Sequence, residues 1–186
     1  MRNVRMKQVS SLVLAFAFVL LLGACGDGGD NTSEFTGNEV STELIPGTVE
    51  GNTTTGTLVI KERTDGRAQL EITLNNVLNG AQHPVHLHFG SLDDDGEVAT
   101  FLTTLSESNG VGRSVTILDA LDNDTSVDYS QLLTFNGSIK IHFESSGPLE
   151  NAVLGSTNIG LNTGGNEAYL NGTKDITTCN TIPAGN

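Results

Sequence analysis

Short apolar segments, spaced at intervals typical of strands, constrain the fold of this chain most strongly. In the clearest of them, residues 69–74, Leu70, Ile72 and Leu74 alternate with polar neighbours. A period of two residues is typical of a β-strand with one buried face. Further short apolar segments, separated by glycine, asparagine and aspartate, cover residues 58–60, 84–89, 98–105, 114–118, 138–143 and 152–160. This spacing predicts an all-β domain, an antiparallel Greek-key sandwich or barrel.

The segments between these strands have the composition of turns. Thr64-Asp65-Gly66-Arg67 is expected to form a hairpin turn, and residues 129–135 a short helix. The acidic run Asp93–Glu97 could supply carboxylates to calcium, but its spacing does not match an EF-hand loop. A tight solvated turn is therefore the favoured interpretation of this run.

The amino-terminal residues have the pattern of an export signal. Three basic residues, Arg2, Arg5 and Lys7, precede an apolar run from Leu12 to Leu22, and no acid occurs before Asp27. The run is too short to span a bilayer comfortably, which takes about 20 apolar residues. Residues 1–24 are therefore predicted to be a signal peptide.

The end of this segment, Leu22-Gly23-Ala24-Cys25, resembles the bacterial lipobox. The resemblance implies cleavage before Cys25 and a diacylglycerol on its thiol. Residues 25–40 are polar and glycine-rich at first, so they are predicted to be a flexible tether. The expected location is the bacterial cell envelope, periplasmic or surface-facing, with the membrane as partner through the lipid. An ordinary secretory signal is the alternative.

The rest of the chain suits one β domain at residues 41–176, followed by a loose tail at 177–186. The net charge of −13 makes nucleic acid an unfavourable partner, because nucleic-acid binding rewards clustered lysine and arginine. With Cys25 acylated, Cys179 has no partner for an internal disulfide. It could be buried, paired between chains, or a soft metal ligand.

Three of the four histidines, His83, His86 and His88, lie within nine residues of one another. Strand periodicity sends Val85, Leu87 and Phe89 to the core, so that His86 and His88 share the opposite, outer face. Two residues along a strand span roughly 6.5–7 Å, which lets two imidazoles converge on one metal.

The fourth histidine has the same outward phase. In residues 138–143, Ile139, Ile141 and Phe143 are predicted to face the core and His142 to point outward. If the two strands are neighbours, three imidazoles meet outside the barrel, and imidazole suits copper and zinc. The alternative is that these are exposed histidines without a metal.

The segment Pro84-Val85-His86-Leu87-His88-Phe89-Gly90 resembles the copper-binding strand of Cu,Zn superoxide dismutases, and residues 140–143 resemble a later strand with another copper ligand. The resemblance implies one copper ion on His86, His88 and His142, with His83 as a nearby fourth donor. The zinc-loop histidines and the disulfide of that family are missing. Thr157 stands where that family has its active-site arginine.

Residues 53–162 are equally similar to a CHRD domain, a family named from chordin and frequent among bacterial secreted proteins. The matching segments are residues 86–90, 139–142 and 158–160. We therefore expect a membrane-tethered domain that binds one copper ion. A copper-only superoxide dismutase and a metal-free adhesion or scaffold domain are the alternatives, and the sequence leaves open whether the chain is an enzyme.

Overall fold

A computed structural model describes residues 33–78 and 80–179, so the predicted signal peptide and Cys25 lie outside the described residues. The described part is all-β, as predicted. Its strands are β1 (Phe35–Pro46), β2 (Thr55–Arg63), β3 (Ala68–Asn75), β4 (Gln82–Phe89), β5 (Val98–Ser108), β6 (Val111–Leu118), β7 (Asn136–His142) and β8 (Val153–Gly160).

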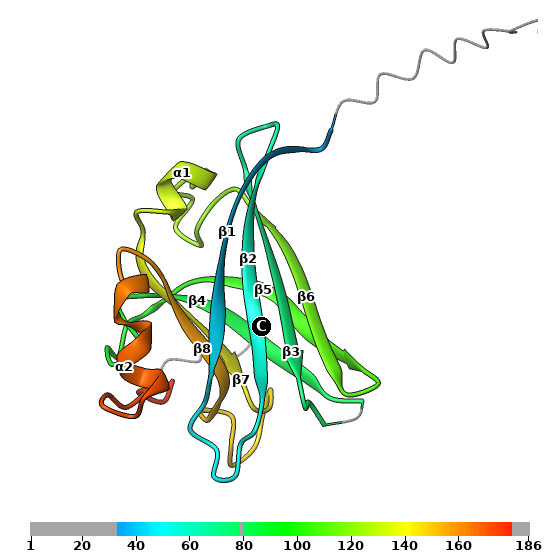
Figure 1. Cartoon of the computed structure of the whole chain (residues 1–186), viewed down its shortest axis with the longest axis vertical. Helices are drawn as coiled ribbons and strands as arrows, with labels where there is room; N and C mark the ends of the chain where they lie inside the picture. Colours follow the sequence, from blue (N-terminus) through cyan, green and yellow to red (C-terminus); the bar gives the residue numbers. More distant parts are fainter. Residues whose placement is uncertain (1–32, 79, 180–186) are drawn as a thin grey trace, which may run out of the picture. The chain divides into compact units, whose positions relative to one another are not determined.

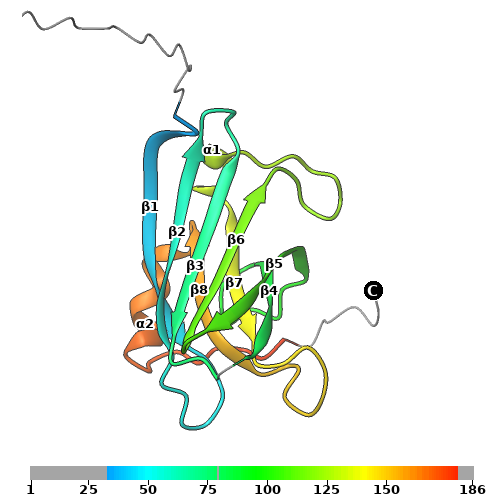
Figure 2. The ribbon, with the colours of Figure 1, turned by 90° about the vertical axis from the view of Figure 1, so that its right-hand side faces the viewer.

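The strands close into a barrel in the order β1-β2-β3-β6-β5-β4-β7-β8 (Figures 1 and 2). Every neighbouring pair is antiparallel. Strands β4, β5 and β6 follow one another as hairpins, and β7 returns to lie beside β4, which is the Greek-key arrangement. The fold places β4 next to β7, the two strands that carry the predicted histidine ligands.

The barrel core is built by the alternation seen in the sequence. Leu70, Ile72 and Leu74 on β3 are all buried, and they belong to one cluster that fills the barrel. Gly66 at the hairpin turn has a φ of 85°, a conformation that glycine adopts without strain. The predicted turn is therefore confirmed, with Arg63 N–H bonded to the carbonyl of Arg67.

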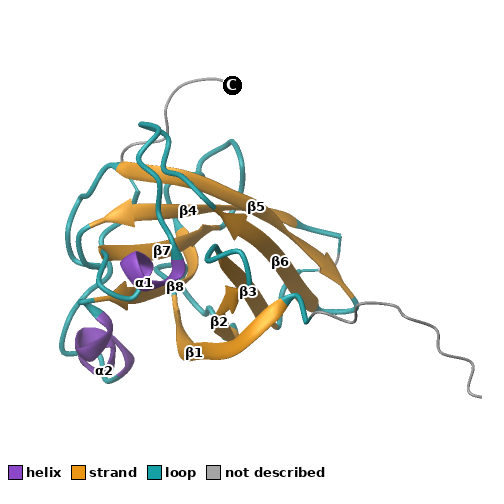
Figure 3. Ribbon diagram, turned by 90° about the horizontal axis from the view of Figure 1, so that it is seen from above, coloured by secondary structure: helices purple, strands orange, loops and turns teal. Residues whose placement is uncertain are grey.

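The helices are short. They are α1 (Tyr129–Leu132), the 3₁₀ turn η1 (Thr163–Gly165) and α2 (Asn166–Leu170). Helix α1 covers one end of the barrel and adds Tyr129 and Leu132 to the core, whereas α2 lies outside the wall (Figures 1 and 3). Among the described residues no helix is both long and apolar enough to cross a membrane.

Two boundaries differ from the sequence prediction. Strand β1 begins at Phe35, within the range predicted as tether, and pairs with β2 as far as Leu44. At the other end, Thr177 and Cys179 are hydrogen-bonded to the domain through Leu92 and Asn151, within the range predicted as a loose tail. Both segments gain order from partners distant in sequence.

Candidate metal centre

The predicted phase of β4 and β7 is confirmed at four positions. Val85 and Leu87 on β4, and Ile139 and Ile141 on β7, are buried in the barrel core. The prediction for Phe89 is wrong, since its side chain is 39% exposed. The ladder between β4 and β5 is irregular between Leu87 and His88, and Phe89 is the last residue of β4.

The opposite face of these strands is covered rather than open to solvent. His86 pairs with Lys140 across β4 and β7, and Lys140 pairs with Ser156 across β7 and β8. Buried polar side chains occupy this face, with exposures of 3% or less: His86, His88, Ser138, Lys140, His142, Ser156 and Asn158. We call this set the outer polar layer. Its burial differs from the exposed position expected from periodicity alone.

Two segments cover the outer polar layer. The loop after β4 bonds to it through Leu92 N–H, which donates to Asn158 Oδ1 at 2.9 Å. The chain after α2 crosses the lower end of the barrel, as drawn in Figure 2, beside β7 and β8. There Thr177 accepts a hydrogen bond from Lys140 Nζ at 2.9 Å, and its own N–H donates to the carbonyl of Leu92.

Within this layer, His86, His88 and His142 form one cluster. Each offers one ring nitrogen, and the three nitrogens lie within 4.8 Å of one another. The rings of His86 and His142 are 4.4 Å apart between centroids, although 55 residues of chain separate them. The expected convergence of the three histidines is therefore confirmed, and the cluster could hold a metal ion.

Backbone carbonyls orient two of the three rings. The Nδ1 atom of His88 lies 3.0 Å from the carbonyl of Gly96, and that of His142 lies 2.8 Å from the carbonyl of Glu150. A carbonyl can only accept, so in each ring Nδ1 carries the proton and Nε2 presents a lone pair. Such a partner commonly orients a metal-binding imidazole.

In two of the three rings, one nitrogen has no hydrogen-bond partner in the protein. His86 Nδ1 and His142 Nε2 are buried and make no hydrogen bond. Phe101 packs edge-on against His86, with ring centroids 4.7 Å apart, and contributes no polar atom to it. Buried polar atoms are rarely left without a partner, so these two nitrogens are free to take one, as are Ser138 Oγ and Ser156 Oγ in the same layer.

Burial also sets the charge of the cluster. It lowers the pKa of His86 to about 3 and that of His88 to about 4, and neighbouring positive groups contribute to both shifts. Burial lowers the pKa of His142 as well. At neutral pH these imidazoles are uncharged, which is the form that binds a metal.

Lys140 is a component of this layer that the sequence did not single out. Its side chain is 1% exposed, and burial lowers its pKa. None of the ion pairs in the described part of the chain involves Lys140. Lys140 stands between Ile139 and Ile141, which face the core, so strand periodicity places its side chain on the outer face. No other sequence pattern points to its role in this layer.

Cys179 lies beside the cluster. It is buried, unpaired, and places Sγ 3.6 Å from His88 Nε2. Burial raises the pKa of its thiol to about 11. Of the three possibilities open for this residue, burial is therefore shown.

His83 does not join the cluster, although it was expected as a nearby fourth donor. Its Nδ1 atom bonds instead to the carbonyls of His142 and Phe143, at 3.0 and 2.7 Å. Its Nε2 atom is buried without a partner, beside a cavity lined by Phe143, Leu154 and the loop after β1. Pro84 and a ladder irregularity separate His83 from the rest of β4.

The acidic run after β4 is used within the protein. Asp93 accepts hydrogen bonds from Ser91 and Tyr169 and pairs with Lys174 at 2.8 Å. These contacts lower the pKa of its carboxyl well below the ordinary range. They support the turn interpretation and fasten the chain after α2 to the loop that covers the outer polar layer.

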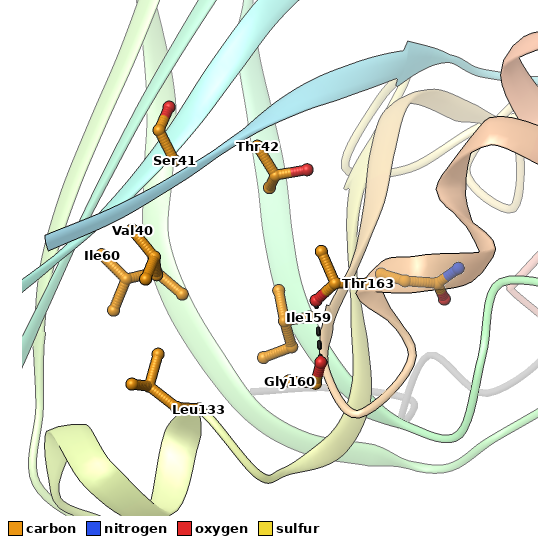
Figure 4. A pocket seen from close by; sticks show the side chains of 9 residues that line it. Val40, Ser41, Thr42, Ile60, Leu133, Ile159, Gly160 and Thr163 are labelled. Carbon is orange, nitrogen blue, oxygen red and sulfur yellow. Dashed lines mark hydrogen bonds between the residues drawn. The ribbon is translucent and has the colours of Figure 1, made fainter.

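A separate cavity of about 320 Å³ opens at the junction of β1 and β8, which pair through only two residue pairs. Val40, Ile60, Leu133 and Ile159 give it apolar walls, and Thr163 beside it bonds to the carbonyl of Gly160 (Figure 4). It contains no histidine or acidic residue, so it lacks the groups of a metal site.

Comparison of the chain with protein-family models, curated proteins and solved structures finds no match. The arguments about function therefore depend on the fold and on the geometry of the histidine cluster.

Proposed function

We propose that this chain is a membrane-tethered domain of the bacterial cell envelope that binds a single copper ion through His86, His88 and His142. The observation that carries the proposal is the convergence of three buried imidazoles, two of which present a nitrogen without any partner. An unsatisfied buried polar atom costs about 1–3 kcal/mol, and a bound ion would remove that cost. The same observation favours binding over a metal-free scaffold.

Copper is proposed for two reasons. Neutral imidazole suits both copper and zinc. The resemblance of residues 84–90 and 140–143 to the copper strands of superoxide dismutases then favours copper over zinc. The barrel places these two segments side by side, on β4 and β7. We likewise propose, from the sequence resemblance alone, that residues 53–162 form a CHRD-like domain.

Binding is proposed in preference to dismutation because the cluster is covered. Superoxide needs an open coordination position, whereas each of the three histidines is at most 3% exposed. A rapid dismutation rate in the copper-loaded protein would reverse this preference.

The proposed site is tested by titrating the full chain with copper in competition with a chromophoric chelator. We expect His86→Ala and His142→Ala each to weaken binding by at least about 10-fold to 100-fold, since even outer-shell changes have effects of that size. Ser114→Ala is the control, because Ser114 is also a buried polar residue of the barrel but lies on β6, outside the cluster. Unchanged affinity in both cluster variants would exclude the site.

The tether is tested by fractionating cells that express the chain. The lipobox-like segment 22–25 predicts that the protein sediments with membranes and that Cys25→Ser releases it. Cys179→Ser is the control for loss of a thiol and should leave the protein in the membrane fraction. If Cys25→Ser stays in the membrane fraction together with Cys179→Ser, the lipid anchor is contradicted.

A further inference from the structure

Resting on the proposed copper site, we propose that Cys179 supplies a fourth, thiolate ligand, so that the carboxy-terminal segment closes a Cys-His₃ centre that favours Cu(I). The sulfur lies 3.6 Å from His88 Nε2 and is buried with it. A second observation points to a ligand in the adjoining histidine cluster, because His86 Nδ1 and His142 Nε2 are buried and unpartnered.

The nitrogen–sulfur distance is that of two donors sharing one ion. In a tetrahedral site with a metal–nitrogen bond of about 2.0 Å and a metal–sulfur bond of about 2.3 Å, the two donors lie about 3.5 Å apart. The observed 3.6 Å already meets this distance for His88. Toward His86 and His142 the sulfur must move closer, because Cys179 is not among the donors that all lie within 4.8 Å of one another. In the metal-free protein the thiol can donate its proton to His88 Nε2 as a weak hydrogen bond.

The fold holds Cys179 in this position from three directions. Its N–H donates to the carbonyl of Asn151 at 3.1 Å, and the N–H of Thr177 donates to Leu92. Lys140 Nζ donates to the carbonyl of Thr177. The thiol is thus positioned by the loops after β4 and β7 and by β7 itself.

Charge balance also favours a thiolate here. The buried Lys140 makes no ion pair with any described acid, although Asp94 and Asp95 act on it electrostatically. A thiolate would offset part of the positive charge that a copper ion bound only by neutral imidazoles brings to this buried site. On binding, the thiol loses its proton to solvent and the sulfur–copper bond replaces the S–H bond, with no change in oxidation state. A thiolate is a soft ligand, which selects Cu(I).

The test uses the full chain carrying Cys25→Ser, which removes the only other thiol. The protein is loaded anaerobically with Cu(I), X-ray absorption is recorded, and affinity is measured by competition with a Cu(I) chelator. We expect a copper–sulfur distance of about 2.3 Å. The added change Cys179→Ser should abolish the sulfur signal and weaken Cu(I) binding about 10-fold to 100-fold.

The outcomes separate this inference from the function on which it rests. Equal Cu(I) affinity and a nitrogen-only signal in both proteins would overturn Cys179 as a ligand, while the three-histidine site would stand. If copper does not bind, or binds equally well after His86 and His142 are replaced, the three-histidine site itself is overturned. Cys179→Ala, with circular dichroism to verify folding, guards against an effect of the serine hydroxyl, and retention of the sulfur signal in it would also overturn the proposal.

Discussion

The two nitrogens of His88 are in different environments, and that difference suits the residue to the proposed metal site. Nδ1 is fixed by the carbonyl of Gly96, whereas Nε2 points to the cluster and Cys179. Strand β4 fixes the position of the His88 backbone, and the loop after β4 fixes the rotation of its imidazole ring. A histidine on an exposed strand would have neither constraint.

Gly96 provides a test of that rotation. A Cβ at this position would lie 1.7 Å from the carbonyl oxygen of Phe89, so Gly96→Ala must shift the loop that orients His88. We expect a loss of copper affinity of about 10-fold to 100-fold, the range typical of outer-shell changes. Gly164→Ala is the control, since a Cβ there meets nothing within 4 Å. Equal copper affinity in the two variants would contradict the orienting role of Gly96.

The histidine pKa values predict how stability depends on pH without metal. His86 and His88 titrate near 3 and 4 when folded, against an ordinary value of 6.5. Between these limits the unfolded chain binds more protons, so stability is full above about pH 6.5 and falls as pH drops toward 4. Each histidine contributes a slope of up to about 1.4 kcal/mol per pH unit.

Urea unfolding of the metal-free protein at pH 7 and pH 5 measures this dependence. His86→Asn removes one titrating group from the cluster and should make the loss of stability between the two values smaller. An identical loss in wild type and variant would show that His86 titrates normally in the folded state.

At the scale of elements, alternation predicted strands whose apolar residues recur every second position. Strand β3 is the clear case, with Leu70, Ile72 and Leu74 all in the core. Strand β1 has no such pattern, because most of its residues are exposed and only Leu44 and Ile45 are buried. Its first residues therefore fit the predicted tether, and its order comes from pairing with β2, which sequence periodicity does not reveal.

Strand β4 permits a test of its phase. Leu87 is fully buried in the barrel, whereas Phe89 on the same strand is 39% exposed. We expect Leu87→Ala to lower the free energy of unfolding by about 2–5 kcal/mol. Phe89→Ala should cost about 1 kcal/mol, as for a partly exposed residue. Chemical denaturation measures both, and a larger loss for Phe89 would contradict the assigned phase.

At the scale of the whole molecule, the sequence predicted which histidines share a face but not that the face is buried. Its cover comes from residues 91–97 and 173–179, which no periodicity links to β4 or β7. Lys140 and Cys179 were missed as neighbours of the cluster for the same reason. Burial of a strand's second face depends on distant segments, so a local pattern predicts only its direction.

Removal of the carboxy-terminal segment tests this cover. A chain ending at Ile176 lacks Thr177 and Cys179 and the hydrogen bonds that hold the segment. We expect the barrel to persist by circular dichroism and the three cluster histidines to react faster with diethyl pyrocarbonate, because their rings become accessible. Unchanged reactivity, measured by mass spectrometry of each histidine, would show that other segments protect the cluster.

The place of this cover along the chain sets an order of assembly. Synthesis proceeds from the amino end, so β8 is complete before residues 173–179 exist. The barrel wall that carries His86, His88 and His142 can therefore close while the outer face is still bare. Under the proposed function, an ion would reach the imidazoles directly from solvent during that interval, before Thr177 and Cys179 take their places beside the site. The same cover would then slow the exchange of a bound ion in the finished fold.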